Sequence, residues 1–296
     1  MTGAQKGFLL LTQRLGDPLA KPLTPAQFRE LSRLARLMDR PSEDRSLRQE
    51  DLMACGCDRA FSKRIISLLN REEALNWYIG QAEKAGCVPV TCFSGDYPAR
   101  LDRSLGADAP AVLWAKGDLS LLSKPGISLV GSRELRPENH RFAQQLGTMA
   151  AQLGLVLVSG NARGADRTAQ ESCLEAGGCV VSVVADRLEE HICRERVVYL
   201  SEDGFDASFS SHRALRRNRI IHSLNEKTVV AQCTYEKGGT WDGTVKNLRQ
   251  GWSQVYCFQD GSAAAKALCD LGAYPIVEVL PEMLLQESPK QLQMKI

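Results

Sequence analysis

Several signals of common protein classes are missing from this sequence. No hydrophobic run approaches the roughly 20 residues that a membrane-spanning helix needs. Residues 8–11 form one short apolar patch, but no longer hydrophobic segment or cleavage site accompanies it, so we expect no signal peptide. These absences predict a cytoplasmic protein.

The usual motifs for nucleotide cofactors and for catalysis are also absent. There is no Gly-x-x-x-x-Gly-Lys-Ser/Thr segment for the phosphates of ATP and no Gly-x-Gly-x-x-Gly segment for a dinucleotide. The four histidines are scattered, and no Ser/His/Asp or Cys/His arrangement can be recognised. We therefore expect no cofactor and no catalytic residues.

Cysteine is plentiful, with ten residues, but its spacing excludes the common metal motifs. No Cys-x-x-Cys pair occurs, and Cys55 and Cys57 are spaced wrongly for a zinc knuckle. Several cysteines lie in apolar, strand-like runs, where a thiol behaves as a small hydrophobic group. We predict reduced cysteines and no metal site.

Neither sign of charge predominates, because 37 Lys and Arg residues stand against 35 Asp and Glu residues, for a net charge of +2. A protein that binds polyanions through its overall field is therefore not expected. Any affinity for nucleic acid has to come from a local arrangement of basic residues.

Residues 1–95 are predicted to form a small all-helical domain. Thr24 and Pro25 fit a helix N-cap and first turn. The apolar residues that follow are spaced on one stripe, and Pro41 with Ser42 ends the helix; the stripe is Phe28, Leu31, Leu34, Ala35 and Met38. Further helices are expected at 47–56, 58–69 and 71–85.

Residues 96–285 are predicted to form an α/β domain of doubly wound, Rossmann-like type. A short strand at 87–93 precedes it, and a connector rich in Gly, Pro and Asp follows that strand at the boundary near residue 95. Strands are expected at 127–131, 155–160, 179–185, 197–201, 228–232, 254–258 and 274–279. Helices are expected at 137–153, 164–176, 213–224, from about 242, and at 262–271. Strands that are apolar on both faces and alternate with helices indicate a mostly parallel, covered sheet. Residues 286–296 are expected to be a loose tail.

Two loops that follow predicted strands could bind phosphate. Gly131, Ser132 and Arg133 combine a tight turn, a hydroxyl and a guanidinium group. The second loop combines glycines and N–H donors at the start of a helix, with an arginine; its candidate residues are Ser159, Gly160, Ala162, Arg163, Gly164 and Asp166. Asp166 could instead simply cap the helix, and either loop could be a plain turn.

Two further clusters complete the candidate site. Arg213, Arg216, Arg217 and Arg219 lie close together beside Asn218, and helical spacing predicts that the first three share a face. Such crowding is unfavourable unless an anion relieves it, although a solvated helix face is the alternative. The last loop, Lys237, Gly238, Gly239 and Thr240, is glycine-rich and could hold a phosphate beside Trp241, which could stack on a base. Because parallel strands bind ligands at their carboxyl ends, we expect all four clusters to meet at one edge.

In this order the motifs resemble those of the DNA-processing protein A (DprA/Smf) family. That family has a Gly-Ser-Arg loop, a Ser-Gly-x-Ala-x-Gly-Ile-Asp loop, Ser-Glu, Arg-Asn-Arg-Ile-Ile and a Ser-Gly-Ser/Thr loop. The similar segments here are 131–133, 159–166, 201–202, 217–221 and 238–240. The helical N-terminal part also resembles the family's small domain of SAM or helix-hairpin-helix type.

The resemblance implies a non-catalytic protein that binds single-stranded DNA in a basic pocket, with Arg133, Arg163, Arg217 and Arg219 on phosphates. It also implies a homodimer that works with a RecA-type recombinase in DNA-mediated transformation and DNA recombination. Ala165 stands in place of the family's Ile and Gln170 in place of its His, and no C-terminal winged helix is expected, which indicates a divergent member.

Two other functions remain open from the sequence. The glycine-rich loop partly resembles that of nucleotide phosphoribohydrolases, in which case Glu236 or Asp242 would be the acid–base group. Alternatively, the same pocket would serve a sensor that binds a free nucleotide and signals through the helical domain.

Overall fold

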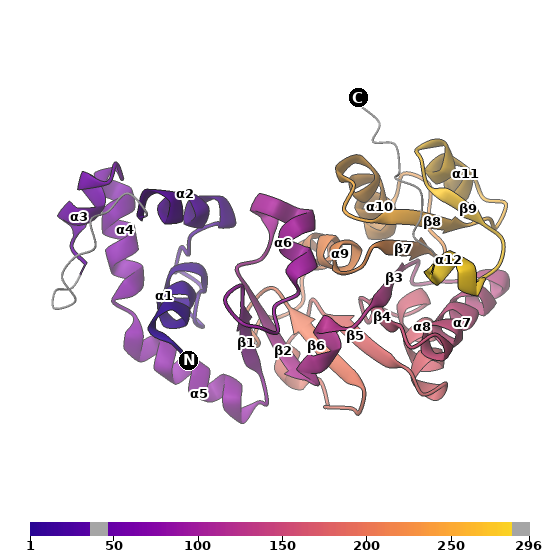
Figure 1. Ribbon diagram of the computed structural model, residues 1–296, viewed down its shortest axis with the longest axis horizontal. Helices are drawn as coiled ribbons and strands as arrows, with labels where there is room; N and C mark the ends of the chain where they lie inside the picture. The colour runs from indigo at the N-terminus through magenta and orange to yellow at the C-terminus, as the bar shows by residue number, and fades with distance from the viewer. Residues whose placement is uncertain (36–46, 286–296) are drawn as a thin grey trace.

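The computed structural model describes residues 1–35 and 47–285 as an α/β unit with a group of helices at one end (Figure 1). The predicted fold class, a mostly parallel, doubly wound sheet preceded by helices, is confirmed. No helix in the described ranges is long and apolar enough to span a membrane. Met38, the helix end expected at Pro41 and Ser42, and the expected tail 286–296 lie outside the described residues.

The helices before the sheet are α1 (Gly3–Thr12), α2 (Pro25–Ala35), α3 (Gln49–Ala54), α4 (Arg59–Leu69) and α5 (Glu72–Lys84). The sequence pattern predicts α2 to α5 but misses α1, because its buried residues 8–11 are contiguous rather than spaced at helical intervals. Helix α1 begins with a capping box, in which Thr2 and Gln5 each accept the other's backbone N–H.

Within the described ranges the sheet has nine strands in the order β1-β2-β6-β5-β4-β3-β7-β8-β9. Strands β3 to β9 pair in parallel, whereas β1 and β2 are antiparallel to their neighbours. The strands are β1 (Val88–Thr91), β2 (Val112–Gly117), β3 (Gly126–Val130), β4 (Val156–Ser159), β5 (Cys179–Val183), β6 (Val197–Ser201), β7 (Lys227–Val230), β8 (Gln254–Phe258) and β9 (Tyr274–Ile276).

The predicted connector after residue 95 is wrong in part, because it contains α6 (Ala99–Leu105) and β2. Strand β2 is buried from Val112 to Lys116 and lies between β1 and β6. The Gly- and Pro-rich flanks of this segment conceal its short apolar run at the level of sequence. Strand β1 precedes the predicted domain boundary near residue 95 and pairs with β2; the boundary itself stays a prediction.

Helices cover both faces of the sheet. One core joins β3 and β4 to α7 (Pro137–Gln152) and α8 (Ala165–Glu175), on the lower side of the strands in Figure 1. The other core joins the opposite face to α9 (Ser211–Leu224), α10 (Gly238–Gln250) and α11 (Ala263–Asp270). A short last helix, α12 (Pro281–Leu285), follows β9. Buried strands with helices on both sides explain why the strands are apolar throughout.

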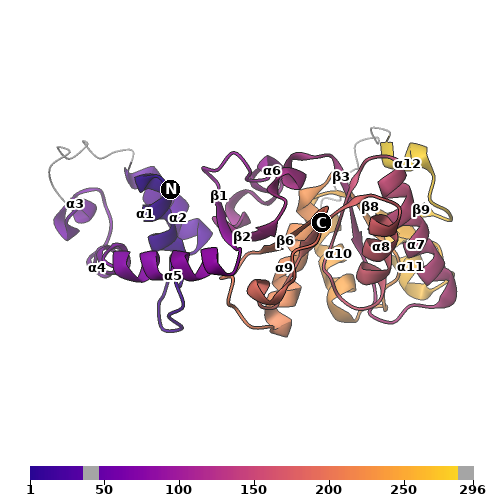
Figure 2. The ribbon, with the colours of Figure 1, turned by 90° about the horizontal axis from the view of Figure 1, so that it is seen from below.

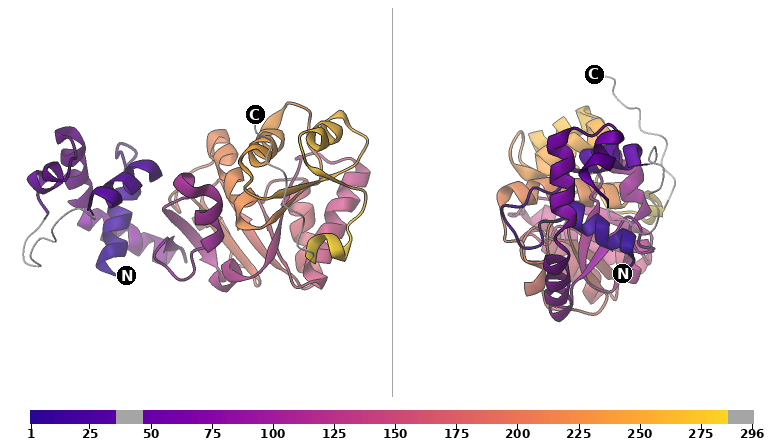
Figure 3. Two further views of the ribbon diagram at one scale, coloured as in Figure 1. Left: turned by 45° about the horizontal axis from the view of Figure 1, so that its top comes forward. Right: turned by 90° about the vertical axis from the view of Figure 1, so that its left-hand side faces the viewer.

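The N-terminal helices are joined to the sheet through α1 and α5. Phe8 of α1 and Tyr78 of α5 belong to the same buried cluster as Trp114 of β2. The Trp114 indole donates a hydrogen bond to the Gln13 side chain at 2.9 Å. A separate small core holds the helices farther from the sheet together and includes Leu31 and Ile65. Figures 2 and 3 show α5 running from this group of helices to the sheet.

Candidate nucleic-acid interface

A pocket of about 940 Å³ lies at the carboxyl ends of β3 and β7. These strands are neighbours, and the chain continues from β3 to β4 on one side and from β7 to β8 on the other, so they form the switch point of the sheet. All four predicted clusters contribute to the pocket, which confirms that they converge. The predicted residues that line it are Gly131, Ser132, Arg133, Ala162, Arg163, Asp166, Arg217, Asn218, Lys237, Gly238, Gly239 and Thr240.

The hydroxyl groups of the first and last loops hold the loops together. Ser132 donates both its N–H, at 2.9 Å, and its hydroxyl, at 3.2 Å, to the carbonyl oxygen of Gln232. The Thr240 hydroxyl donates to the carbonyl oxygen of Gly131 at 3.0 Å. A Cβ atom on Gly131 would overlap Ala165, so only glycine fits there. These contacts form a rigid floor rather than a set of free hydroxyl donors.

The second loop turns around a buried carboxylate. Asp166 accepts the N–H groups of Gly160 at 3.1 Å and Ala162 at 3.2 Å. The Asp166 carboxylate therefore occupies backbone N–H groups that the sequence pattern predicts to bind a phosphate. Ser159 lies behind the loop and bonds to Gln170 at 2.6 Å, and Gly164, with a φ of +82°, makes the turn into α8; neither lines the pocket.

Asp166 and Arg217 both lie close to Gly160. A Cβ atom on Gly160 would overlap the Arg217 guanidinium and meet the Asp166 carboxylate at 2.7 Å. Arg217 also donates to the carbonyl oxygen of Val183. Burial raises the pKa of Asp166 to about 6, although Arg217 and the two backbone N–H groups act to lower it. Burial likewise lowers the pKa of Arg217, against the attraction of Asp166.

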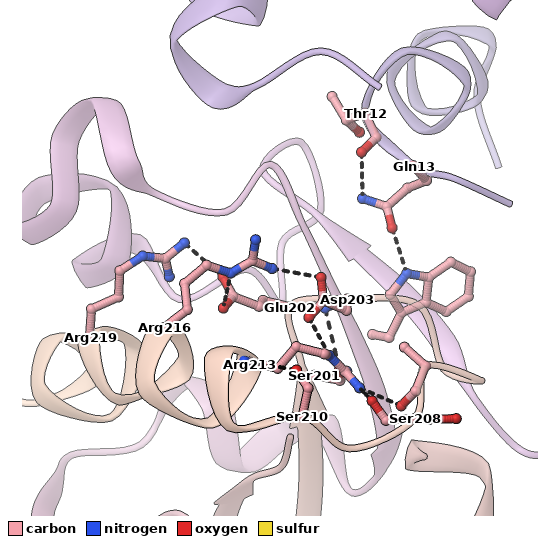
Figure 4. A network of polar contacts seen from close by, with 12 residues as sticks. Thr12, Gln13, Ser201, Glu202, Asp203, Ser208, Ser210, Arg213, Arg216 and Arg219 are labelled. Carbon is pink, nitrogen blue, oxygen red and sulfur yellow. Dashed lines mark hydrogen bonds and ion pairs between the residues drawn. The ribbon is translucent and has the colours of Figure 1, made fainter. Parts of the chain in front are cut away.

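The arginines of α9 do not share one face as expected. Arg217 and Asn218 line the pocket, whereas Arg213, Arg216 and Arg219 line a second cavity on the other side of the helix, of about 670 Å³. Two carboxylates at the end of β6 form ion pairs with these three arginines (Figure 4). The structure therefore does not bring Arg213 and Arg219 together with the other candidate residues.

The last loop brings a helix N-terminus to the pocket. Helix α10 begins at Gly238, with a φ of +83°, and not near Asp242 as expected. The Asn218 side chain donates to the carbonyl oxygen of Gly239 at 3.0 Å and so ties α9 to this loop. Trp241 is buried and packs edge-on against Tyr235, so it offers no face to a base; Tyr235 is 46% exposed.

Positive charge predominates around the pocket. Asp166 is buried, and Glu134 pairs with Arg163 at 3.1 Å on the exposed rim. In the parts of the chain that the structure describes, Arg133 and Lys237 are exposed and have no carboxylate within ion-pair distance. The sequence prediction omits some pocket residues, namely Glu134, Arg136, Leu215 and Gln232. Gln232 could have been found, because it directly follows an apolar strand-like run.

The structure gives little support to a catalytic alternative. Glu236 and Asp242 are exposed and do not line the pocket. His222 is buried and accepts a hydrogen bond from Asn247 at 3.0 Å. The cysteines are free thiols, and no group of three or more potential metal ligands occurs within residues 1–35 and 47–285.

A doubly wound sheet with a basic pocket at its switch point defines a Rossmann-like protein whose pocket has the charge that suits an anionic ligand. A model of the family described as DNA recombination-mediator protein A matches residues 89–279. That match covers most of the chain, and the protein belongs to this family.

Similarity to individual proteins of this family supports the membership. The chain is 32% identical over 156 residues to the DNA processing protein DprA of Bacillus subtilis, which covers 49% of this chain and 52% of the relative. The chain thus spans about half the length of that relative. The crystal structure of DprA from Streptococcus pneumoniae superposes with a TM-score of 0.66 at 21% identity, over 90% of this chain and 99% of that one.

A DNA processing protein A from Helicobacter pylori, described for its single-stranded DNA binding mode, has a TM-score of 0.54 at 21% identity. It covers 65% of this chain and 91% of its own. At such low identity the two solved structures establish the fold, including its doubly wound sheet.

Proposed function

We propose that this protein binds single-stranded DNA, without catalysis, through the pocket at the switch point of its sheet. The main observation is the convergence of three loops and helix α9 on one basic pocket, in which Arg133 and Lys237 have no carboxylate partner among the residues that the structure describes. Free cations at a helix N-terminus suit phosphate groups. Membership of the DNA recombination-mediator family supports a polynucleotide as the source of those phosphates.

The shape of the pocket supports a flexible strand. Arg133 and Lys237 lie on different loops, so they suit two phosphates of one strand. Tyr235 beside the last loop is exposed and can stack on a base, which unpaired nucleotides allow and a duplex does not. Arg163 contributes less, because Glu134 already neutralises it.

The test is fluorescence anisotropy with a labelled single-stranded oligonucleotide over a range of salt concentrations. Arg133→Ala and Lys237→Ala are each expected to weaken binding by about tenfold and to reduce the salt dependence by about one phosphate contact. Arg249→Ala is the matched control, because Arg249 lies in the last turn of α10, at the end opposite to the pocket. Equal losses in all three variants, or binding that is insensitive to salt, would contradict the proposal.

A free nucleotide is the second candidate ligand. The pocket volume of about 940 Å³ lies near the upper end of the range for small-molecule sites, about 300–1,000 Å³. Mononucleotides that raise the melting temperature, combined with no affinity for oligonucleotides, would favour a sensor. Release of a free base from a nucleotide would instead favour a phosphoribohydrolase.

The finer features that the family suggests are part of the same proposal. We propose a cytoplasmic homodimer that cooperates with a RecA-type recombinase in DNA recombination and DNA-mediated transformation. We also propose that residues 1–95 form a helical domain and 96–285 the DNA-binding domain. Light scattering tests the homodimer. Co-purification with a recombinase in the presence of single-stranded DNA tests the partner.

A further inference from the structure

Two acidic residues directly after β6 bind the flank of α9 that faces away from the pocket (Figure 4). Glu202 contacts Nε of Arg216 at 2.8 Å and Nη2 of Arg219 at 2.7 Å, with a different carboxylate oxygen for each. Asp203 likewise contacts Nη2 of Arg216 and Nε of Arg213, both at 2.6 Å. All four carboxylate oxygens of this acidic pair are therefore engaged.

The contacts form one alternating chain of charges along α9, in the order Arg213, Asp203, Arg216, Glu202, Arg219. The pair of Glu202 and Arg219 is the best shielded from water, with side chains 5% and 18% exposed, whereas Arg216 lies at the surface. Burial acts to raise the pKa of Asp203, but the hydrogen bonds and charges of Arg213 and Arg216 together hold it below its ordinary value. Within the protein, these two negative charges offset two of the three positive charges and so reduce the repulsion among the arginines.

The rotation of α9 about its axis decides which residues reach the pocket. At about 100° per residue, Arg213, Arg216 and Arg219 lie on one flank, and Asn218 lies on the opposite flank. Ile220 and Ile221 are buried in the core between α9 and the sheet. On this side the Ser128 hydroxyl also donates to the carbonyl oxygen of Ile221 at 2.6 Å, nearer the end of the helix, whereas the acidic pair contacts its earlier turns.

The acidic pair is anchored where it can control that rotation. Glu202 and Asp203 follow Ser201, the last residue of β6, so their backbone is fixed to the sheet. Arg213 also donates to the carbonyl oxygens of Ala207 and Ser208, which fastens the rest of the loop to the start of α9. The chain of charges thus connects the sheet to nearly two turns of the helix.

We propose that Glu202 and Asp203 are positioning residues of the DNA site, which fix α9 in the rotation that points Arg217 and Asn218 into the pocket. This inference rests on the proposed function. Neither carboxylate lines the pocket, so both act on DNA only through α9. Removing either carboxylate adds positive charge to the protein. We nevertheless expect it to lower the affinity for DNA, which is a polyanion.

The first experiment compares wild type with Asp203→Asn by anisotropy and thermal unfolding. Asp203→Asn is expected to reduce affinity for a single-stranded oligonucleotide by about fivefold, while the protein stays folded at the assay temperature. The control is Asp270→Asn, which makes the same charge change on an exposed residue at the end of α11 and should leave affinity unchanged or slightly higher. Affinity in Asp203→Asn that equals or exceeds wild type would overturn the inference, since the freed arginines would then act as latent phosphate ligands.

A double-mutant comparison separates positioning from general stability. In an Asn218→Ala background, Asp203→Asn should have little further effect on affinity, because the pocket side of α9 is already impaired. In an Arg133→Ala background it should keep its full effect, because Arg133 lies on a different loop. Equal effects in both backgrounds would contradict a role through α9.

A milder variant keeps the inference testable if Asp203→Asn does not fold. Arg216→Lys preserves the net charge but removes the planar group that bridges both carboxylates, and it should also weaken binding. Unchanged affinity in this variant would overturn the inference while leaving the proposed function intact. A wild-type protein that binds no oligonucleotide would instead overturn the proposed function and this inference together.

Discussion

The arginines on the two flanks of α9 differ in the carboxylates that lie near them. On one flank, Arg213, Arg216 and Arg219 are matched by two carboxylates that use every oxygen. On the pocket side, the buried Arg217 is attracted mainly by Asp166, whose burial raises its pKa to about 6, and also by Asp186. An arginine cluster in a sequence therefore gives no measure of its free positive charge. The partners, which lie elsewhere in the chain, decide which residues can still hold a ligand.

The largest expected effect comes from removing the arginine on the pocket side. Arg217→Ala leaves Asp166 buried without its nearby cation, and we expect the free energy of unfolding to fall by about 3 kcal/mol. Chemical denaturation measures the change. The double variant with Asp166→Asn should be less destabilised than the sum of the single variants. Strict additivity would mean that Asp166 and Arg217 do not depend on each other.

Gly160→Ala is expected to have the next largest effect. Its new methyl group would overlap the Arg217 guanidinium, so either the loop or the arginine has to move. We expect a loss of about 2 kcal/mol in unfolding free energy, together with weaker binding to single-stranded DNA. Gly154→Ala is the comparison, because a Cβ there meets nothing within 4 Å, although its positive φ carries a small cost of its own. Gly160 is not at a positive φ, so a loss no larger than that of Gly154→Ala would show that the overlap with the arginine contributes little.

A smaller effect is expected from pH. The folded pKa of Asp166, about 6, lies above its ordinary value of 3.8. Its contribution to stability is therefore fully present below pH 3.8 and is lost as the pH rises through about 6. Protonation also removes a negative charge from the pocket, so affinity for single-stranded DNA should rise severalfold between pH 7 and pH 5. Asp166→Asn should abolish that dependence; an unchanged pH profile in this variant would assign it to another group.

The smallest effect is expected at the exposed rim. Arg163 and Glu134 form an ion pair whose side chains are 72% and 88% exposed. Arg163→Ala should change the unfolding free energy by less than about 0.5 kcal/mol, because exposed pairs contribute little. The affinity for DNA should fall by no more than a few-fold. A loss as large as that of Arg133→Ala would show that DNA displaces Glu134 and uses Arg163 directly.

The sequence predicts the regular part of the fold well, because long apolar strands that alternate with amphipathic helices leave few alternatives. It predicts β3 to β8 and their helices to within a few residues. It misses β2, whose neighbours in the sheet are set by pairing with β1 and β6 rather than by local pattern. It also misses α1, whose apolar residues form a solid run because both flanks of the helix are covered.

For the candidate site, the sequence patterns predict which segments meet but not how their charged residues are paired. Glycines and charges near strand ends correctly predict that three loops and helix α9 meet, because the edge of a parallel sheet brings them together. The same patterns cannot show that Asp166 fills the N–H cup, since either a helix cap or a ligand fits the sequence. They also cannot assign Arg213 and Arg219, whose partners Glu202 and Asp203 lie in a loop before the helix.

The hydrogen bond between Gln13 and Trp114 has a consequence for the order in which the chain folds during synthesis. The two residues are 101 positions apart, so the apolar run of α1 leaves the ribosome long before β2 exists to cover it. At about 5–20 residues per second, this surface stays without its final partner for roughly 5–20 s. Helix α1 is therefore made well before the strand that completes its cover, and its exposure during that interval is a natural point for chaperone binding.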